Sequence, residues 1–104
     1  MYVIVHFTRF NITKVKDENP IEFPMETQFK RLDPLNNFWY HLIGIVSHSG
    51  SIYSGHYTAY AKNVLTTKWY HFNDSFVTPI SSPVNESHIS RNAYMLLYSR
   101  DDKN

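Results

Sequence analysis

Apolar residues run almost without interruption from Tyr2 to Phe10, in the segment YVIVHFTRF. Because β-branched and aromatic side chains dominate this run, it predicts a strand that is buried on both faces. Residues 11–20 are polar and end at a proline, which indicates an exposed connection. We expect a short strand at Ile21–Phe23 next, closed by Pro24.

The rest of the chain alternates strand signals with turn signals. Residues 25–37 read as a loop with one helical turn, and residues 38–48 (FWYHLIGIVSH) return to strand composition. The segment SGSIYSG, residues 49–55, has the composition of a mobile loop. Strands at residues 56–62 and 68–73 should follow, joined as a hairpin by NVLTT.

Near the C-terminus, Ser82 followed by Pro83 is typical of a helix N-cap and first helical position. A short helix should therefore run to about Arg91, followed by a last strand at AYMLLYSR and a solvated tail at residues 101–104. No internal repeat or second domain is visible. The order of elements predicts a strand-dominated α+β domain built on a mostly antiparallel sheet.

Composition narrows the class of protein. With 104 residues, 42% hydrophobic and 16% aromatic, the chain is long enough for one folded core. The net charge of +1 gives no basic face for nucleic acid. There is no cysteine, so the chain has no disulfide, thiolate metal site or cysteine nucleophile of its own. Neither a signal peptide nor a membrane-spanning run is present, so we expect a soluble intracellular protein without membrane association, cytoplasmic or nuclear.

His56 is the first candidate for chemistry. Gly55 before it lets a backbone or ligand approach, and Tyr57 after it offers an aromatic face with a polar tip. If the hairpin pairs so that facing residue numbers have an odd sum, His56 shares a sheet face with Asn73, whereas an even sum puts Asp74 there. Either partner would fix the imidazole tautomer and leave the other nitrogen free to take a proton. The alternative is a histidine that serves packing only.

The remaining histidines show no HxxxH or HExxH spacing, so we expect no metal site. His48 stands apart from them because it flanks the same loop as His56. The aromatic residues are most simply assigned to core and cross-strand packing. They are Phe38, Trp39, Tyr40, Trp69, Tyr70, Phe72, Tyr94 and Tyr98.

Four segments in this order and spacing carry a family resemblance. LIGIVSHSGSIYSGHYTAYAKN, KWYHFNDSFVTPIS and AYMLLYSR resemble the C-terminal half of the catalytic domain of ubiquitin-specific proteases. The opening VIVHFTRF with IEFP resembles that family's apolar strand and short Phe-Pro strand. The resemblance covers nearly the whole chain. It implies that residues 1–100 are the C-terminal part of such a domain, corresponding to the palm of a papain-like cysteine protease, with residues 101–104 as a tail.

The resemblance also implies roles for individual residues. His56 would be the general base of a Cys-His-Asn/Asp triad, Asn73 its third member and Asp74 an auxiliary polar residue. An amide suffices in the third position, because a Cys-His couple can exist as thiolate and imidazolium and needs only orientation. His48, Gly55 and Tyr57 would form part of the wall of the channel that receives the ubiquitin tail. The implied partner is ubiquitin or a ubiquitinated protein, and no cofactor is implied.

Some parts of the family pattern are missing. Many members have glycine where this chain has Ser54, and the family's nucleophilic cysteine, oxyanion asparagine and CxxC zinc motifs have no counterpart here. We therefore expect that the chain alone has no deubiquitinase activity and that a Cys-bearing N-terminal half completes it. The alternatives are a catalytically dead module that binds ubiquitin or another protein, and an unrelated β-rich interaction module.

Overall fold

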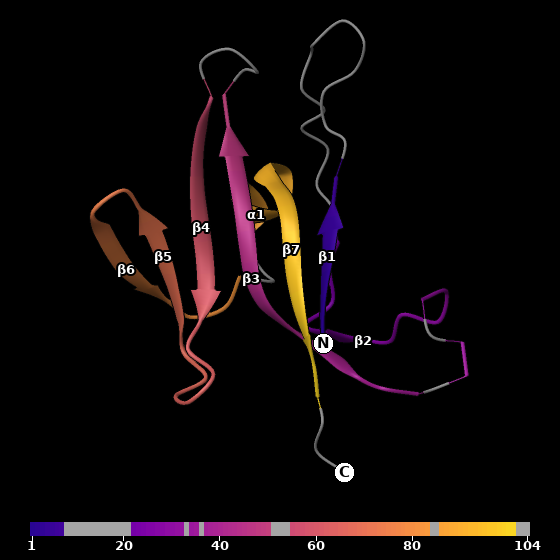
Figure 1. Ribbon diagram of the computed structural model, residues 1–104. Coiled ribbons are helices and arrows are strands. Elements are labelled where there is room, and N and C mark those ends of the chain that lie inside the picture. Colours follow the sequence, from indigo (N-terminus) through magenta and orange to yellow (C-terminus); the bar gives the residue numbers. More distant parts are fainter. Residues whose placement is uncertain (8–21, 33, 36, 51–54, 84–85, 102–104) are drawn as a thin grey trace, which may run out of the picture.

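The structure, a computed structural model, describes residues 1–7, 22–32, 34–35, 37–50, 55–83 and 86–101. These residues form an open sheet and one short helix (Figure 1). The elements are β1 (Tyr2–His6), β2 (Glu26–Thr27), β3 (Tyr40–Ser49), β4 (His56–Lys62), β5 (Trp69–Asn73), β6 (Phe76–Ile80), α1 (Ser87–Asn92) and β7 (Ala93–Arg100).

The strands lie in the order β1-β7-β3-β4-β5-β6, and β2 pairs with the beginning of β3. Every pair is antiparallel. This confirms the expected strand-dominated domain with an antiparallel sheet. β7 lies between β1 and β3, and it comes to β3 only after the chain has passed through β4, β5, β6 and α1. In the described part of the chain, no helix is long and apolar enough to span a membrane.

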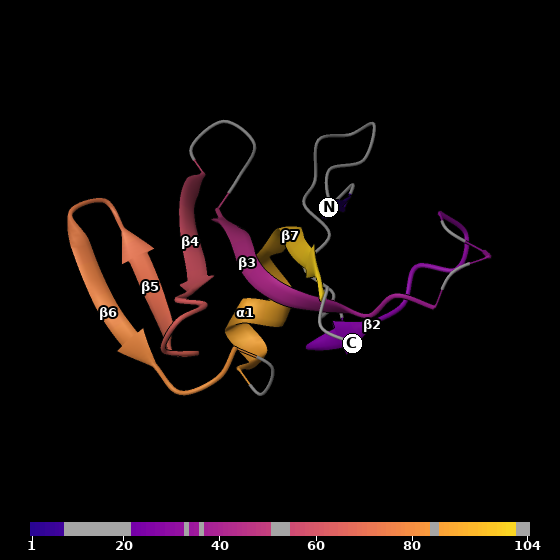
Figure 2. The ribbon, with the colours of Figure 1, turned by 60° about the horizontal axis from the view of Figure 1, so that its bottom comes forward.

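One face of the sheet carries the core, and α1 packs on this face (Figure 2). Ile89 of α1 is buried together with Leu42 and Ile45 of β3. Tyr98 is buried as well, and its hydroxyl donates a hydrogen bond to the Pro24 carbonyl oxygen at 2.7 Å. Burial raises the pKa of Tyr98 to about 12. The other buried core residues are Val3, Phe23, Tyr40, Tyr60, Trp69, Ala93 and Leu96.

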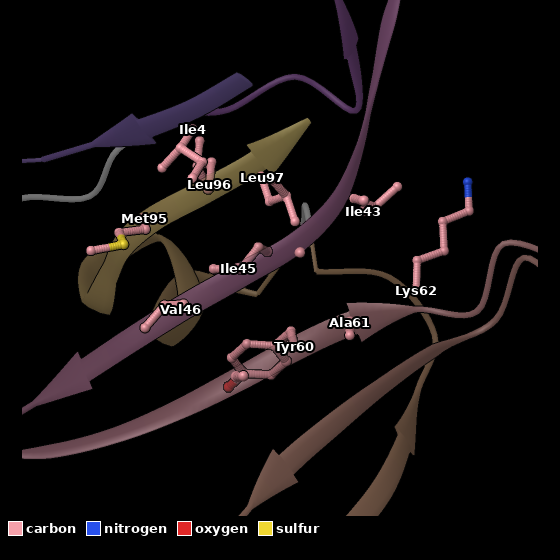
Figure 3. Close-up of a pocket in the computed structure, with 12 residues that line it drawn as sticks. Ile4, Ile43, Ile45, Val46, Tyr60, Ala61, Lys62, Met95, Leu96 and Leu97 are labelled. Atoms are coloured by element: carbon pink, nitrogen blue, oxygen red, sulfur yellow. The ribbon is translucent and has the colours of Figure 1, made fainter. Parts of the chain in front are cut away.

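The opposite face is apolar and largely uncovered by the described residues. A groove of about 450 Å³ runs over it, and Ile4, Gly44, Val46, Ala59 and Leu97 are among the residues that line it (Figure 3). Gly44, which has no side chain, and Ala59 add little bulk to this lining, and Ile4 of the outer strand β1 is 66% exposed. The sheet therefore has a packed face and an open apolar face.

The expectation that the first strand is buried on both faces is wrong. Val3 is 8% exposed, whereas Tyr2 and Ile4 are each 66% exposed, so β1 alternates. Within the described residues, β1 is an outer strand that pairs only with β7, and α1 covers only one face of the sheet. The predicted extension of this strand to Phe10 and the connection 11–20 lie outside the described residues, apart from Phe7, whose N–H bonds to Tyr94 O at 2.9 Å.

The short strand predicted at Ile21–Phe23 is not formed by its described residues, and the strand comes instead at Glu26–Thr27. Phe23 is 6% exposed and serves as a core anchor. Next to it, the Met25 carbonyl accepts a hydrogen bond from the Leu42 N–H at 2.8 Å, which leads the chain into β2. Where one helical turn was expected within residues 25–37, the described residues form a single hydrogen-bonded turn and no helix. In this turn the Leu32 N–H donates a hydrogen bond to Phe29 O at 3.2 Å.

The hairpin of β4 and β5 is confirmed with nearly the expected bounds, but β6 was not expected. Pro79 weakens the strand signal of this segment because it cannot donate a backbone hydrogen bond. β6 pairs only with β5, where Pro79 faces Tyr70, so Pro79 lies in an outer strand and tolerates the missing donor. Of the loop predicted at 49–55, residues 51–54 lie outside the described residues, as do residues 102–104 of the tail.

The helix begins later than predicted, at Ser87 with Glu86 as N-cap, so Ser82 and Pro83 are not its first residues. Pro83 is fully buried, and its carbonyl accepts a hydrogen bond from the Glu86 N–H at 3.5 Å. Pro83 thus anchors a turn ahead of the helix. The predicted end near Arg91 and the last strand at residues 93–100 are confirmed.

Candidate active site

His56 and Asn73 lie at adjacent strand ends, one opening β4 and the other closing β5. The pairs Ala59 with Phe72 and Tyr60 with His71 have an odd sum of residue numbers, which puts His56 and Asn73 on the same face. Their side chains meet, with His56 Nε2 at 2.8 Å from Asn73 Oδ1. The register thus selects Asn73, one of the two partners that the sequence left open.

This hydrogen bond defines the state of the imidazole. The Asn73 side-chain oxygen is an acceptor, so Nε2 of His56 carries the hydrogen and donates it. In the neutral ring Nδ1 then holds a lone pair. His56 is exposed, so its ring is accessible, while the hydrogen bond from the half-buried Asn73 side chain fixes the orientation of the ring. The pair has the chemical form of an oriented general base.

Asp74 lies in the two-residue turn between β5 and β6 and is exposed. Its φ of 53° is in the left-handed region, which aspartate tolerates better than most residues and which tight hairpins require. Among the described residues, no hydrogen bond or ion pair joins Asp74 to His56. Its proximity in sequence to Asn73 therefore does not bring it into direct contact with the imidazole.

The predicted tail-binding residues His48 and Tyr57 face each other directly across β3 and β4. Their ring centroids are 4.6 Å apart, and His48 is 2% exposed beneath a Tyr57 that is 55% exposed. Gly55, which is half-buried, precedes β4 beside them. Tyr57 follows His56 in β4, so its exposed aromatic surface lies on the opposite face of the strand from the imidazole.

A third ring belongs to this group and was not singled out from the sequence. Tyr94 lies 5.8 Å from Tyr57 and 6.3 Å from His48 between ring centroids, and 4.6 Å from His6 of β1. The register of β3 against β7 shifts here, between Val46 and Ser47, which inserts Tyr94 as an extra residue. Sequence alternation assigned Tyr94 to core packing because a bulge leaves no signal in the pattern of apolar residues.

Within the described residues, no group of three or more His, Asp or Glu side chains has the arrangement needed to hold a metal ion. The chain also supplies no thiol. The chemistry that these residues support is therefore proton transfer and ring orientation by His56 and Asn73.

Comparison with known proteins identifies the class. The family model "Ubiquitin carboxyl-terminal hydrolase" matches residues 1–98, so the chain belongs to this family. Ubiquitin carboxyl-terminal hydrolase 2 of Gallus gallus is 35% identical over 103 residues, covering 92% of this chain and 28% of that protein. Ubiquitin carboxyl-terminal hydrolase 4 of Rattus norvegicus is 36% identical over 107 residues, covering 96% of this chain and 11% of that protein.

Solved structures agree with this classification. A SAGA DUB module containing Ubp8, Sgf11, Sgf73 and Sus1 matches with a TM-score of 0.81 and 34% identity, covering 99% of this chain and 24% of the matched chain. A SAGA DUB module bound to ubiquitin aldehyde matches with a TM-score of 0.76 and 32% identity, covering 99% and 25%. The chain thus spans about a quarter or less of the length of these relatives.

Proposed function

We propose that this chain is the C-terminal, histidine-bearing part of the catalytic domain of a cysteine-type deubiquitinase. The main support for this proposal is the hydrogen bond of 2.8 Å between His56 Nε2 and Asn73 Oδ1, in a chain that belongs to the ubiquitin carboxyl-terminal hydrolase family. The proposed reaction is hydrolysis of the peptide or isopeptide bond that follows the C-terminal glycine of ubiquitin.

In this proposal His56 acts through Nδ1, the nitrogen that does not contact Asn73. Nδ1 takes the proton of a cysteine thiol supplied by residues outside this chain, and the thiolate attacks the carbonyl carbon of the scissile bond. The imidazolium then gives its proton to the leaving amine, and water hydrolyses the thioester. Asn73 holds the ring in the required tautomer, and Asp74 is an auxiliary polar residue at the same hairpin end.

Ubiquitin is the proposed partner. Solved relatives were captured with monoubiquitin and with ubiquitin aldehyde, which supports this choice. The aromatic surface of Tyr57, supported by His48 and preceded by Gly55, is the proposed wall for the ubiquitin tail. A tail that ends in glycine fits a narrow channel, and ring faces stack well against an extended backbone without side chains.

A second candidate function is ubiquitin or protein binding without catalysis. The absence of cysteine from all 104 residues favours it, because His56 then has no thiol within its own chain to activate. The two candidates differ in whether a Cys-bearing segment joins this chain. A Cys-bearing N-terminal half, on the same polypeptide or a separate one, is therefore part of the first proposal, together with an intracellular location.

The two candidates are separated by reconstitution. The chain is mixed with the Cys-bearing N-terminal half of a relative, and release of a fluorophore from the ubiquitin C-terminus is followed, alongside ubiquitin binding by each half. We expect hydrolysis only from the mixture, and loss of about 10²- to 10⁴-fold in rate with His56→Ala. His41→Ala, a histidine change on β3 away from this site, is the matched control. Ubiquitin binding with no hydrolysis would favour the binding module, and undiminished hydrolysis by His56→Ala would refute the assignment of His56 as general base.

A further inference from the structure

A second histidine, His71, packs beside the candidate site on the core face of the same hairpin. His71 faces Tyr60 directly across β4 and β5, and the two rings stack with centroids 4.3 Å apart and planes 10° from parallel. Tyr60 is 4% exposed, so the stack forms part of the buried layer beneath the sheet. The position of His71 is therefore fixed by ring contact and by the strand ladder together.

The buried nitrogen of this ring has no partner within the described structure. His71 Nε2 is inaccessible to solvent and makes no hydrogen bond there. Burial and, to a lesser extent, the nearby His88 lower the pKa of His71 below its ordinary value of 6.5. A protonated ring would place an N–H at Nε2 with no acceptor. The neutral ring is thus the form that this packing accepts.

The titratable groups around His71 come from two elements. Tyr60 of β4 is stacked on it, and its own pKa is raised by burial and by Glu86. Glu86 and His88 lie at the beginning of α1, with His88 Nδ1 at 3.6 Å from Glu86 Oε2, a contact that is an ion pair when His88 is protonated. On the β6 side, His71 faces Thr78, which carries no charge. Glu86 is engaged with His88, and no described contact joins its carboxylate to the buried His71 nitrogen.

The stack lies on the same hairpin as the candidate catalytic pair. The backbone ladder of β4 and β5 extends from Lys62 and Trp69 only as far as Ala59 and Phe72. The hydrogen bond of His56 with Asn73 therefore lies beyond the last residues that pair between β4 and β5, where these two strands separate most easily. His71 is two residues before Asn73 and on the same face, so its packing sets how the end of β5 lies against β4.

We propose that His71 is a pH-sensitive positioning residue for the His56–Asn73 pair. The neutral ring, stacked on Tyr60, holds the end of β5 where Asn73 Oδ1 reaches His56 Nε2, and protonation of His71 loosens this end and breaks the pair. The folded state binds the His71 proton more weakly than the unfolded state. The stabilisation is therefore present above pH 6.5 and is lost as pH falls below 6.5 through the lower folded value. This role rests on the proposed function of His56 and Asn73.

The test follows the imidazole nitrogens of the 104-residue chain by long-range ¹H–¹⁵N NMR, together with the Asn73 side-chain amide, as pH is lowered from neutral. The titration of each histidine is read from its own ring signals. In the wild type we expect two transitions at Asn73, one with the titration of His56 and a second with that of His71. His71→Phe keeps an aromatic ring for stacking but cannot titrate, so the second transition should be lost while the His56 Nε2–H remains at neutral pH.

His88→Gln is the second variant, and we expect it to keep the fold because the His88 side chain is exposed. Because His88 lowers the pKa of His71, removing its imidazole should move the His71 transition, and with it the second Asn73 transition, to higher pH. The proposal is overturned if the Asn73 signals follow only the titration of His56 in the wild type, or if the second transition persists in His71→Phe. If His71→Phe does not fold, an unmoved Asn73 transition in His88→Gln overturns it. No ubiquitin or thiol enters these measurements, so a negative result here is distinct from failure of the proposed hydrolase role.

Discussion

The two faces of β1 give a sharp test of the packing, because neighbouring residues differ in burial. Val3 is 8% exposed on the core face, and Ile4 is 66% exposed on the open apolar face. Val3→Ala removes two carbon groups, worth about 0.8 kcal/mol each when buried, and adds a cavity penalty, for a total of about 1.5–3 kcal/mol. Ile4→Ala removes three carbon groups, but at 66% exposure only about 0.8 kcal/mol of their burial is lost.

The assay is urea unfolding of both variants and the wild type, with sedimentation velocity at a low and a high protein concentration. We expect Val3→Ala, although it removes fewer carbon atoms, to lower the free energy of unfolding at least about twice as much as Ile4→Ala does. An equal or greater loss for Ile4→Ala in a monomeric protein would refute the assignment of an open face. If the penalty for Ile4→Ala rises only when a Cys-bearing half is added, that half covers the groove.

The remaining predictions concern the site, the groove and the core. In the reconstituted enzyme, Asn73→Ala removes one hydrogen bond worth about 0.5–1.5 kcal/mol, so the hydrolysis rate should fall about 2- to 13-fold, whereas Asp74→Asn should leave it near the wild-type value. A larger loss from Asp74→Asn than from Asn73→Ala would contradict the register. Gly44→Ala should raise the free energy of unfolding by about 0.5–1 kcal/mol in urea titrations, because an added Cβ would lie 3.5 Å from Leu97 Cβ, in ordinary contact. Destabilisation would contradict the room for a Cβ at this position. Because the folded pKa of Tyr98, about 12, lies above its ordinary value of 10.0, the folded state holds this proton more tightly, and roughly 2–3 kcal/mol of stability should be lost between pH 10 and pH 12. Tyr98→Phe should abolish this part of the alkaline loss, and an unchanged profile would show that another group causes it.

The parts of the fold that followed from the sequence are those where a local pattern and the final environment agree. β7 has the bounds predicted from AYMLLYSR, and β4 those predicted from HYTAYAK, because apolar and β-prone residues fill both strands and clear turn signals bound them. The hairpin of β4 and β5 needed only the ordinary length of its connection. These elements carry His56 and Asn73, which is why both residues were found.

The errors come from features that depend on neighbours in space. β1 reads as buried on both faces, but its place in the sheet leaves Ile4 exposed. Pro79 suppresses the strand signal of β6, although an outer strand tolerates it. Proline is favoured at the first position of a helix, but Pro83 is buried in the turn that precedes the helix. In each case the structure of a residue depends on the strand or helix that packs next to it, and the order of apolar and polar residues along the chain does not contain that information.

In the candidate site too, some features follow from the local sequence and others depend on neighbouring strands. The residue types of His56, Asn73 and Asp74 are visible in the sequence, but the choice between Asn73 and Asp74 depends on strand register. A shift of one residue would exchange their faces. Tyr94 was missed because the bulge in β7 redirects it toward Tyr57. Composition thus identifies the kind of chemistry, and register identifies the partner.

The most direct test of the central claim is the protonation of the His56 ring nitrogens, measured by ¹⁵N NMR of the chain at about pH 8, where an ordinary imidazole is neutral. We expect the hydrogen on Nε2, shared with Asn73 Oδ1, a lone pair on Nδ1, and a decrease of the Nε2–H form in Asn73→Ala. A hydrogen on Nδ1 in the wild type, or an unchanged tautomer ratio in Asn73→Ala, would contradict the account, because His56 would then lack the oriented base that the proposed reaction requires.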